Sequence, residues 1–178
     1  MKLNKYIISI LLCMISSVVF TQTTGSRTAS LVLPIVTLLD IEPTGSITMN
    51  FVAPTEAGAS IANPTANTTK WVNYTSAIAP AGLSRRVTAS VNQTISGIDV
   101  KIQAAAASGS GGGTRGTSSG QVTLSTTATT IISGIGGAYT GTGANNGHQL
   151  TISLVVNNYN NISSISSIPI VITYTITE

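Results

Sequence analysis

Few side chains in this sequence of 178 residues can do acid–base or metal chemistry, because it has one histidine, one cysteine and five carboxylates. Asp40 and Glu42 are two positions apart, so on a β-strand they would face the same side, as a general acid and base can. They also precede Pro43-Thr44-Gly45, a turn sequence, and the alternative is that they simply end a strand there. His148 follows Asn145-Asn146-Gly147, so we expect a solvated histidine in a turn.

One glycine motif has the spacing of a nucleotide-binding loop. Residues Gly111 to Gly116 match G-x-G-x-x-G, which binds a pyrophosphate only where it follows a strand and opens a helix. No helical pattern follows Gly116, so we interpret this motif as a flexible loop. We therefore predict that the protein is not an enzyme and has no catalytic residue, no cofactor and no metal site.

Aromatic side chains offer one candidate for ligand binding. Trp71, Tyr74 and Tyr139 could stack against sugar rings, although aromatic residues make up only 4% of the chain. We name Trp71 and Tyr74 as a candidate ligand platform. Packing of Trp71 within the core or at an edge strand is the alternative.

The N-terminus has the pattern of a secretory signal peptide. Lys2 and Lys5 precede an uncharged, mainly apolar run from Tyr6 to Phe20, which is followed by polar residues. We predict that residues 1–21 are cleaved, that the protein is bacterial and secreted or on the cell surface, and that no membrane span remains. Cys13 lies inside this segment, so the rest of the chain has no thiol for a disulfide or a metal site.

Charge excludes a nucleic-acid partner. Lys2 and Lys5 account for two of the three net positive charges, and charged residues form only 7% of the sequence. Electrostatic binding of a polyanion needs a basic patch, and the only adjacent cations after the signal peptide are Arg85 and Arg86.

Apolar residues alternate along the chain with a period of two, which predicts strands, and no window after residue 22 has helical periodicity. The clearest case runs from Ile168 to Thr177, where Ile170, Ile172, Tyr174 and Ile176 share one face. Residues 150–156 and 46–51 show the same alternation. Weaker candidates are 29–36, 70–74, 86–91, 98–104, 122–125 and 129–132. Short strands at this spacing predict an all-β antiparallel sandwich of about seven to nine strands.

Two stretches interrupt the strand pattern with many glycines. Residues 108–120 and 133–147 contain most of the glycines of the second half of the chain. We expect both to be mobile connections, because glycine-rich segments behave as flexible linkers.

Residues Ala29 to Ser46, ASLVLPIVTLLDIEPTGS, resemble the start of the cysteine-free major pilins of the enteric colonisation-factor class. The glycine- and serine-rich middle and the last Thr/Tyr/Ile strand fit the same resemblance. It implies an immunoglobulin-like sandwich, residues 37–178, preceded by an N-terminal extension, residues 22–36, that fills a groove in the next subunit. Leu31, Leu33 and Ile35 would be the donor side chains. The alternative is that this segment is the first strand of a complete domain.

These observations predict a secreted structural or adhesive surface protein, with a fimbrial or fibre subunit assembling by strand donation as its most specific form. The expected partners are copies of itself or other surface subunits, and glycans. The alternative is a monomeric extracellular β-sandwich module that binds carbohydrates or surfaces.

Overall fold

The computed structural model describes residues 24–178, so the predicted signal peptide, residues 1–21, and its cleavage site lie outside the described residues. The chain divides after Leu33 into two units, and each is described separately. Residues 24–33 have no regular secondary structure, and residues 34–178 form a strand domain.

The domain confirms the predicted all-β fold class. It has nine strands, all paired antiparallel, and one short 3-10 turn, η1, at Tyr159–Asn161. The strands are β1 (Val36–Glu42), β2 (Asn67–Ala77), β3 (Arg85–Val91), β4 (Ile98–Ala104), β5 (Gly112–Ser118), β6 (Gln121–Thr123), β7 (Thr129–Tyr139), β8 (His148–Val156) and β9 (Ile172–Thr177). Within residues 24–178 no helix is long and apolar enough to cross a membrane.

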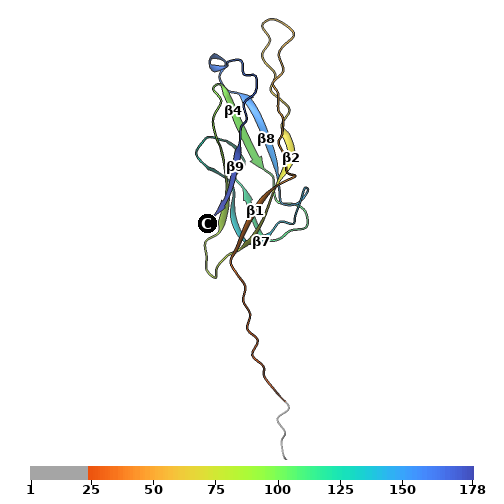
Figure 1. Ribbon diagram of the computed structural model, residues 1–178, viewed down its shortest axis with the longest axis vertical. Coiled ribbons are helices and arrows are strands. Elements are labelled where there is room, and N and C mark those ends of the chain that lie inside the picture. The colour runs from red at the N-terminus through yellow and green to blue at the C-terminus, as the bar shows by residue number, and fades with distance from the viewer. Residues whose placement is uncertain (1–23) are drawn as a thin grey trace, which may run out of the picture. The chain divides into compact units, whose positions relative to one another are not determined.

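Hydrogen bonding connects all nine strands in the order β6-β4-β8-β2-β7-β3-β9, with β1 added to β2 and β5 added to β7. Strand β2 changes partner along its length: Lys70 lies opposite Leu150 of β8, whereas Thr75 lies opposite Tyr139 of β7. This switch divides the paired strands into a sandwich-like arrangement around one core. Figure 1 shows β1 and β9 as neighbours within it.

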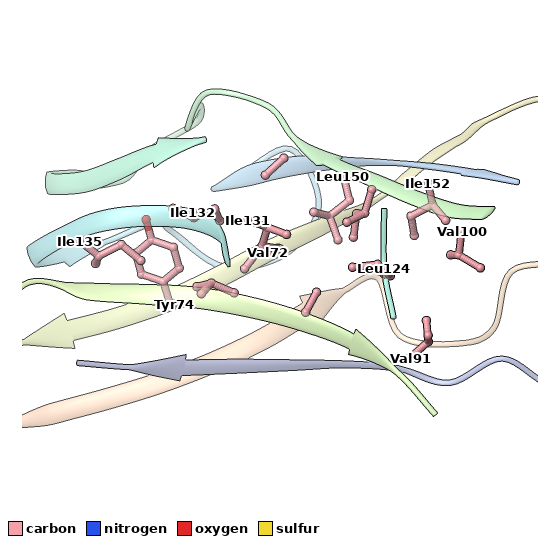
Figure 2. Packing of buried hydrophobic residues seen from close by; sticks show 14 of the residues in the cluster. Val72, Tyr74, Val91, Val100, Leu124, Ile131, Ile132, Ile135, Leu150 and Ile152 are labelled. Carbon is pink, nitrogen blue, oxygen red and sulfur yellow. The ribbon is translucent and has the colours of Figure 1, made fainter. Parts of the chain in front are cut away.

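The core is built from alternating positions of the paired strands. Strand β3 illustrates the pattern, because Val87, Ala89 and Val91 are buried whereas Arg86 is exposed. Side chains that are fully buried include Val72, Val87, Ile102, Ile131, Ile132, Ile135 and Leu150, several of which are visible in Figure 2. Each contributes about 1.5–3 kcal/mol by leaving water.

The glycine-rich stretches lie partly in strands, and the expectation of mobile connections is wrong for residues 112–118 and 133–139. Residues 112–118 of β5 pair with residues 132–139 of β7. Gly113 has a φ of +80°, and a Cβ atom there would overlap the carbonyl oxygen of Gly137. The glycines are therefore needed for two backbones to approach closely, not for flexibility.

Three predicted strands differ from the structure. The strand predicted for residues 168–177 begins only at Ile172, as β9. The first paired strand begins at Val36, and residues 29–35 have no ladder partner. Residues 46–51 are also outside the named strands, although Ile47 and Met49 are half-buried against the core and the residues between them are exposed. The alternation therefore identified which side chains face inward, but it does not tell whether the backbone finds a partner.

Candidate functional site

A groove opens in the domain between β1 and β9. In the described part of the chain, β1 pairs only with β2 and β9 only with β3, and the two strands lie side by side without hydrogen-bonded pairing. The groove has a volume of about 400 Å³. Its lining includes Ile41, Ile47, Ile152, Ile170, Ile172 and Tyr174, so the side chains on its walls are mainly aliphatic.

Strand β9 supplies one wall of this groove because of its alternating sequence. Ile170, Ile172, Tyr174 and Ile176 all pack partly buried against the core, as the predicted face requires. The residues between them, among them Thr173 and Thr175, are exposed. The wall is therefore apolar core surface that is left incompletely covered.

The other wall is held in place by Lys70, whose side chain is buried. Its Nζ donates hydrogen bonds to the carbonyl oxygens of Pro43 (2.5 Å) and Gly45 (2.7 Å) just after β1. Burial raises the pKa of Tyr174, on the opposite wall, above its ordinary value, so its hydroxyl stays protonated at neutral pH. Among the described residues that line the groove, Lys70 is the only charged one. Its ammonium group already donates hydrogen bonds to backbone carbonyl oxygens.

The predicted donor side chains are highly exposed. Leu31, Leu33 and Ile35 have 92%, 83% and 65% of their surface exposed, and Val32, between the first two, has 84%. Large apolar side chains exposed in succession are unusual on a soluble surface. Residues 31–35 thus carry apolar area for which the described residues offer no cover.

The predicted ligand platform is not assembled. Trp71 and Tyr74 are three positions apart on β2, so their side chains point to opposite faces of the strand. Tyr74 is 3% exposed, and its hydroxyl donates to the carbonyl of Arg115. Trp71 lies opposite Glu42 of β1 on the outer face, and Tyr139 is exposed on β7. The structure therefore does not bring these aromatic residues together as one stacking surface.

His148 is fully buried, so the expectation of a solvated turn histidine is wrong. Its Nδ1 lies 2.8 Å from the carbonyl oxygen of Ala105, and must carry a proton to donate to it. Its Nε2 lies 3.0 Å from the Tyr74 hydroxyl, and the two rings stack. These partners come from distant segments, so the turn sequence before His148 gave no signal of them.

Asp40 and Glu42 lie on the same face of β1, as their spacing predicts for a strand. They line a second hollow, of about 270 Å³, together with Asn73 of β2. Asn73 is 6% exposed, and sequence reasoning did not single it out as a binding residue. Within residues 24–178, no three His, Cys, Asp or Glu side chains cluster as a metal-binding group.

The groove between β1 and β9 and the hollow beside Asp40 both offer room for a partner or ligand. Comparisons of the chain with protein-family models, curated proteins and solved structures find no match, so it is assigned to no family.

Proposed function

We propose that the protein is an exported structural or adhesive subunit whose copies join by strand donation. In this proposal, residues 28–35 of one copy lie in the groove between β1 and β9 of the next copy. Such assembly is the one implied by the resemblance of residues 29–46 to pilins.

The open backbone edges support this proposal. A strand edge presents unpaired N–H and C=O groups and is a template for another strand. Here two edge strands, β1 and β9, border the same groove, so an inserted strand can pair with the open edge of β1 or of β9. This arrangement is the single observation that carries the proposal.

The extension has side chains that match the groove. Leu31, Leu33 and Ile35 alternate along the chain, so in an extended strand all three face one way, toward the aliphatic walls. Burying each contributes about 1.5–3 kcal/mol. Pro34 lacks an N–H and its side chain faces away from the groove, so it costs only a ladder hydrogen bond.

A pair of matched variants tests the proposal. Residues 22–178 of the wild type, Leu33→Asp and Val32→Asp are compared by light scattering and electron microscopy. Leu33 and Val32 are equally exposed in the described chain, but only Leu33 belongs to the inward-facing set. We expect the wild type and Val32→Asp to assemble into linear polymers and Leu33→Asp to stay monomeric.

Two results would contradict strand donation. One is a wild-type chain that remains monomeric at all concentrations, and the other is equal assembly of Leu33→Asp and the wild type. A groove variant, Ile170→Asp, serves as the acceptor-side check, because its monomers should fail to receive a donor while still donating to wild-type subunits.

A further inference from the structure

The second hollow lies on the outer face of β1 and β2, away from the groove side chains. Its polar lining comes from Asp40 and Glu42 of β1, Asn73 and Thr75 of β2, and the loop Gly141–Gly143. Asp40 stands directly opposite Asn73 in the strand register. Side chains directly opposite each other have Cβ atoms about 4.5–5.5 Å apart, so these groups reach a common point.

The two carboxylates lack a cationic partner in the described part of the chain. The ion pairs found among residues 24–178 are Arg85 with Glu178 and Lys101 with Asp99, and neither involves Asp40 or Glu42. No lysine or arginine lines the hollow. One oxygen of Asp40 accepts a hydrogen bond from the backbone N–H of Ile41 at 2.8 Å, which leaves its other oxygen for a ligand.

Asn73 is the observation that points to a ligand rather than to two solvated acids. Its Nδ2 donates to the carbonyl oxygen of Asn146 at 2.7 Å, which fixes the orientation of the amide. Its Oδ1 is buried and is the one buried side-chain oxygen or nitrogen without a hydrogen-bond partner among the described residues. Asn73 lines the hollow, and a buried acceptor left unpaired costs about 1–3 kcal/mol, so a cation or donor bound beside Oδ1 would remove this cost.

The available ligands define the chemistry of that cation. The oxygen-bearing side chains among the lining residues include two carboxylates, the Asn73 amide and the hydroxyl groups of Thr75 and Thr142, which are all hard oxygen donors. Calcium takes six to eight such oxygens in flexible geometry, whereas magnesium demands a tighter octahedral shell. We propose that Asp40, Glu42 and Asn73 form a calcium-binding site. The sequence predicts no metal site because such a site would have to rely on the few carboxylates, and this proposal revises that expectation.

Calcium here would tie the glycine-rich loop to the first strand. Asn146, which holds Asn73, also donates from its Nδ2 to the carbonyl of Thr142 at 2.8 Å, so the loop and the amide form one connected unit. A cation shared by β1 and this unit adds a link across segments far apart in the sequence. This proposal does not depend on strand donation, because the hollow shares no lining residue with the groove.

Terbium luminescence provides a direct test, because Tb³⁺ replaces Ca²⁺ at oxygen sites and is excited by a nearby indole. Trp71, the only tryptophan, lies opposite Glu42 in the register and on the same outer face. We expect residues 22–178 to give saturable Tb³⁺ emission excited through Trp71, and Ca²⁺ to displace it at lower concentration than Mg²⁺ does. Asp40→Asn and Glu42→Gln should each weaken binding about tenfold or more, because affinity follows the number of charged ligands.

Glu56→Gln is the matched control, because Glu56 is an exposed acid outside the hollow. It should bind Tb³⁺ and Ca²⁺ like the wild type, and circular dichroism checks that all variants are folded.

Absence of saturable emission from the folded wild type overturns the proposal, as does equal binding by Asp40→Asn, Glu42→Gln and Glu56→Gln. Displacement by Mg²⁺ before Ca²⁺ overturns the choice of calcium. If an oligolysine peptide binds the hollow and calcium does not, the acids serve a basic protein partner instead. If Asp40→Asn or Glu42→Gln fails to fold, the order in which Ca²⁺ and Mg²⁺ displace Tb³⁺ from the wild type still tests the proposal of a calcium site.

Discussion

At the residue scale, the molecule uses its few polar core side chains to hold backbone carbonyl groups. Lys70 donates to Pro43 and Gly45, His148 to Ala105, and Tyr74 to Arg115. Each of these bonds crosses between separate segments of the chain. A buried donor without such a partner would destabilise the fold, so these residues act as fixed links rather than as reactive groups.

Tyr174 gives a pH-dependent stability at the same scale. Burial raises the pKa of Tyr174, and also that of Tyr74, above the ordinary value of 10.0. The unfolded chain therefore loses these protons first as the pH rises through about 10, and the free energy of unfolding falls above that pH. Below pH 10 the free energy of unfolding is not affected by these two groups. Above it, each tyrosine lowers the free energy of unfolding by at most about 1.4 kcal/mol per pH unit.

Thermal unfolding between pH 8 and pH 12 checks this expectation. Tyr174→Phe should decrease the alkaline slope relative to the wild type, because phenylalanine has no proton to lose. Tyr139→Phe, at an exposed position, should keep the wild-type slope. An unchanged slope in Tyr174→Phe would show that its hydroxyl is not desolvated in the folded protein.

At the scale of elements, β1 is an edge strand fastened at both ends. Lys70 holds the segment after Glu42, and Arg85 of β3 holds Val36, where the strand begins. Arg85 is 3% exposed and donates to the carbonyl oxygen of Val36 (2.5 Å) and to Oγ of Ser76 (3.0 Å). Its other terminal nitrogen lies 3.4 Å from the carboxylate of Glu178.

Adjacent arginines allow a controlled test of this anchor. Arg85→Met should lower the free energy of unfolding by about 1–3 kcal/mol for each buried acceptor that it leaves unpaired. Arg86→Met, at the next and exposed position, should change it by less than about 0.5 kcal/mol. Chemical denaturation monitored by Trp71 fluorescence measures both, and equal effects would contradict the anchoring role of Arg85.

The elements also show which parts of the fold the sequence could predict. Strands β4, β8 and β9 were predictable, because alternation of apolar side chains is a local property. The β5–β7 pairing was not, because a Cβ atom at Gly113 or Gly116 would overlap the backbone of β7, and only the partner strand reveals this need for glycine. The burial of His148 and the unpaired oxygen of Asn73 could not be predicted for a related reason. The residues around them come from segments that are distant in the sequence.

At the scale of the whole molecule, the chain combines a groove between two edge strands, β1 and β9, with an extension that has exposed apolar side chains. The groove exposes core-facing residues such as Ile172 and Ile47 to solvent at the place where one more strand would fit. Covering them with a strand would remove apolar surface from water and pair an open edge. We therefore expect the isolated domain to gain stability when an extended peptide is supplied.

A complementation experiment measures this gain. The domain beginning at Val36 is mixed with a peptide of residues 24–35 or with the same peptide carrying Leu31→Asp, Leu33→Asp and Ile35→Asp. At a free peptide concentration of about 100 Kd the wild-type peptide should add about 2.7 kcal/mol, which raises Tm by about 5–10 °C. The substituted peptide should leave Tm unchanged, and equal shifts from both peptides would contradict insertion of Leu31, Leu33 and Ile35 into the groove.

The guanidinium group of Arg85 contacts both Val36, at the start of β1, and Glu178. The start of β1 and residue 178 therefore lie close together, and a short glycine–serine linker can join them without crossing the domain. New termini can then be opened at a turn such as Gly120, where no other atom crowds the backbone. Such a circularly permuted chain keeps the groove between β1 and β9 but leaves out residues 24–35, so under the proposed strand donation it would accept a strand without being able to polymerise.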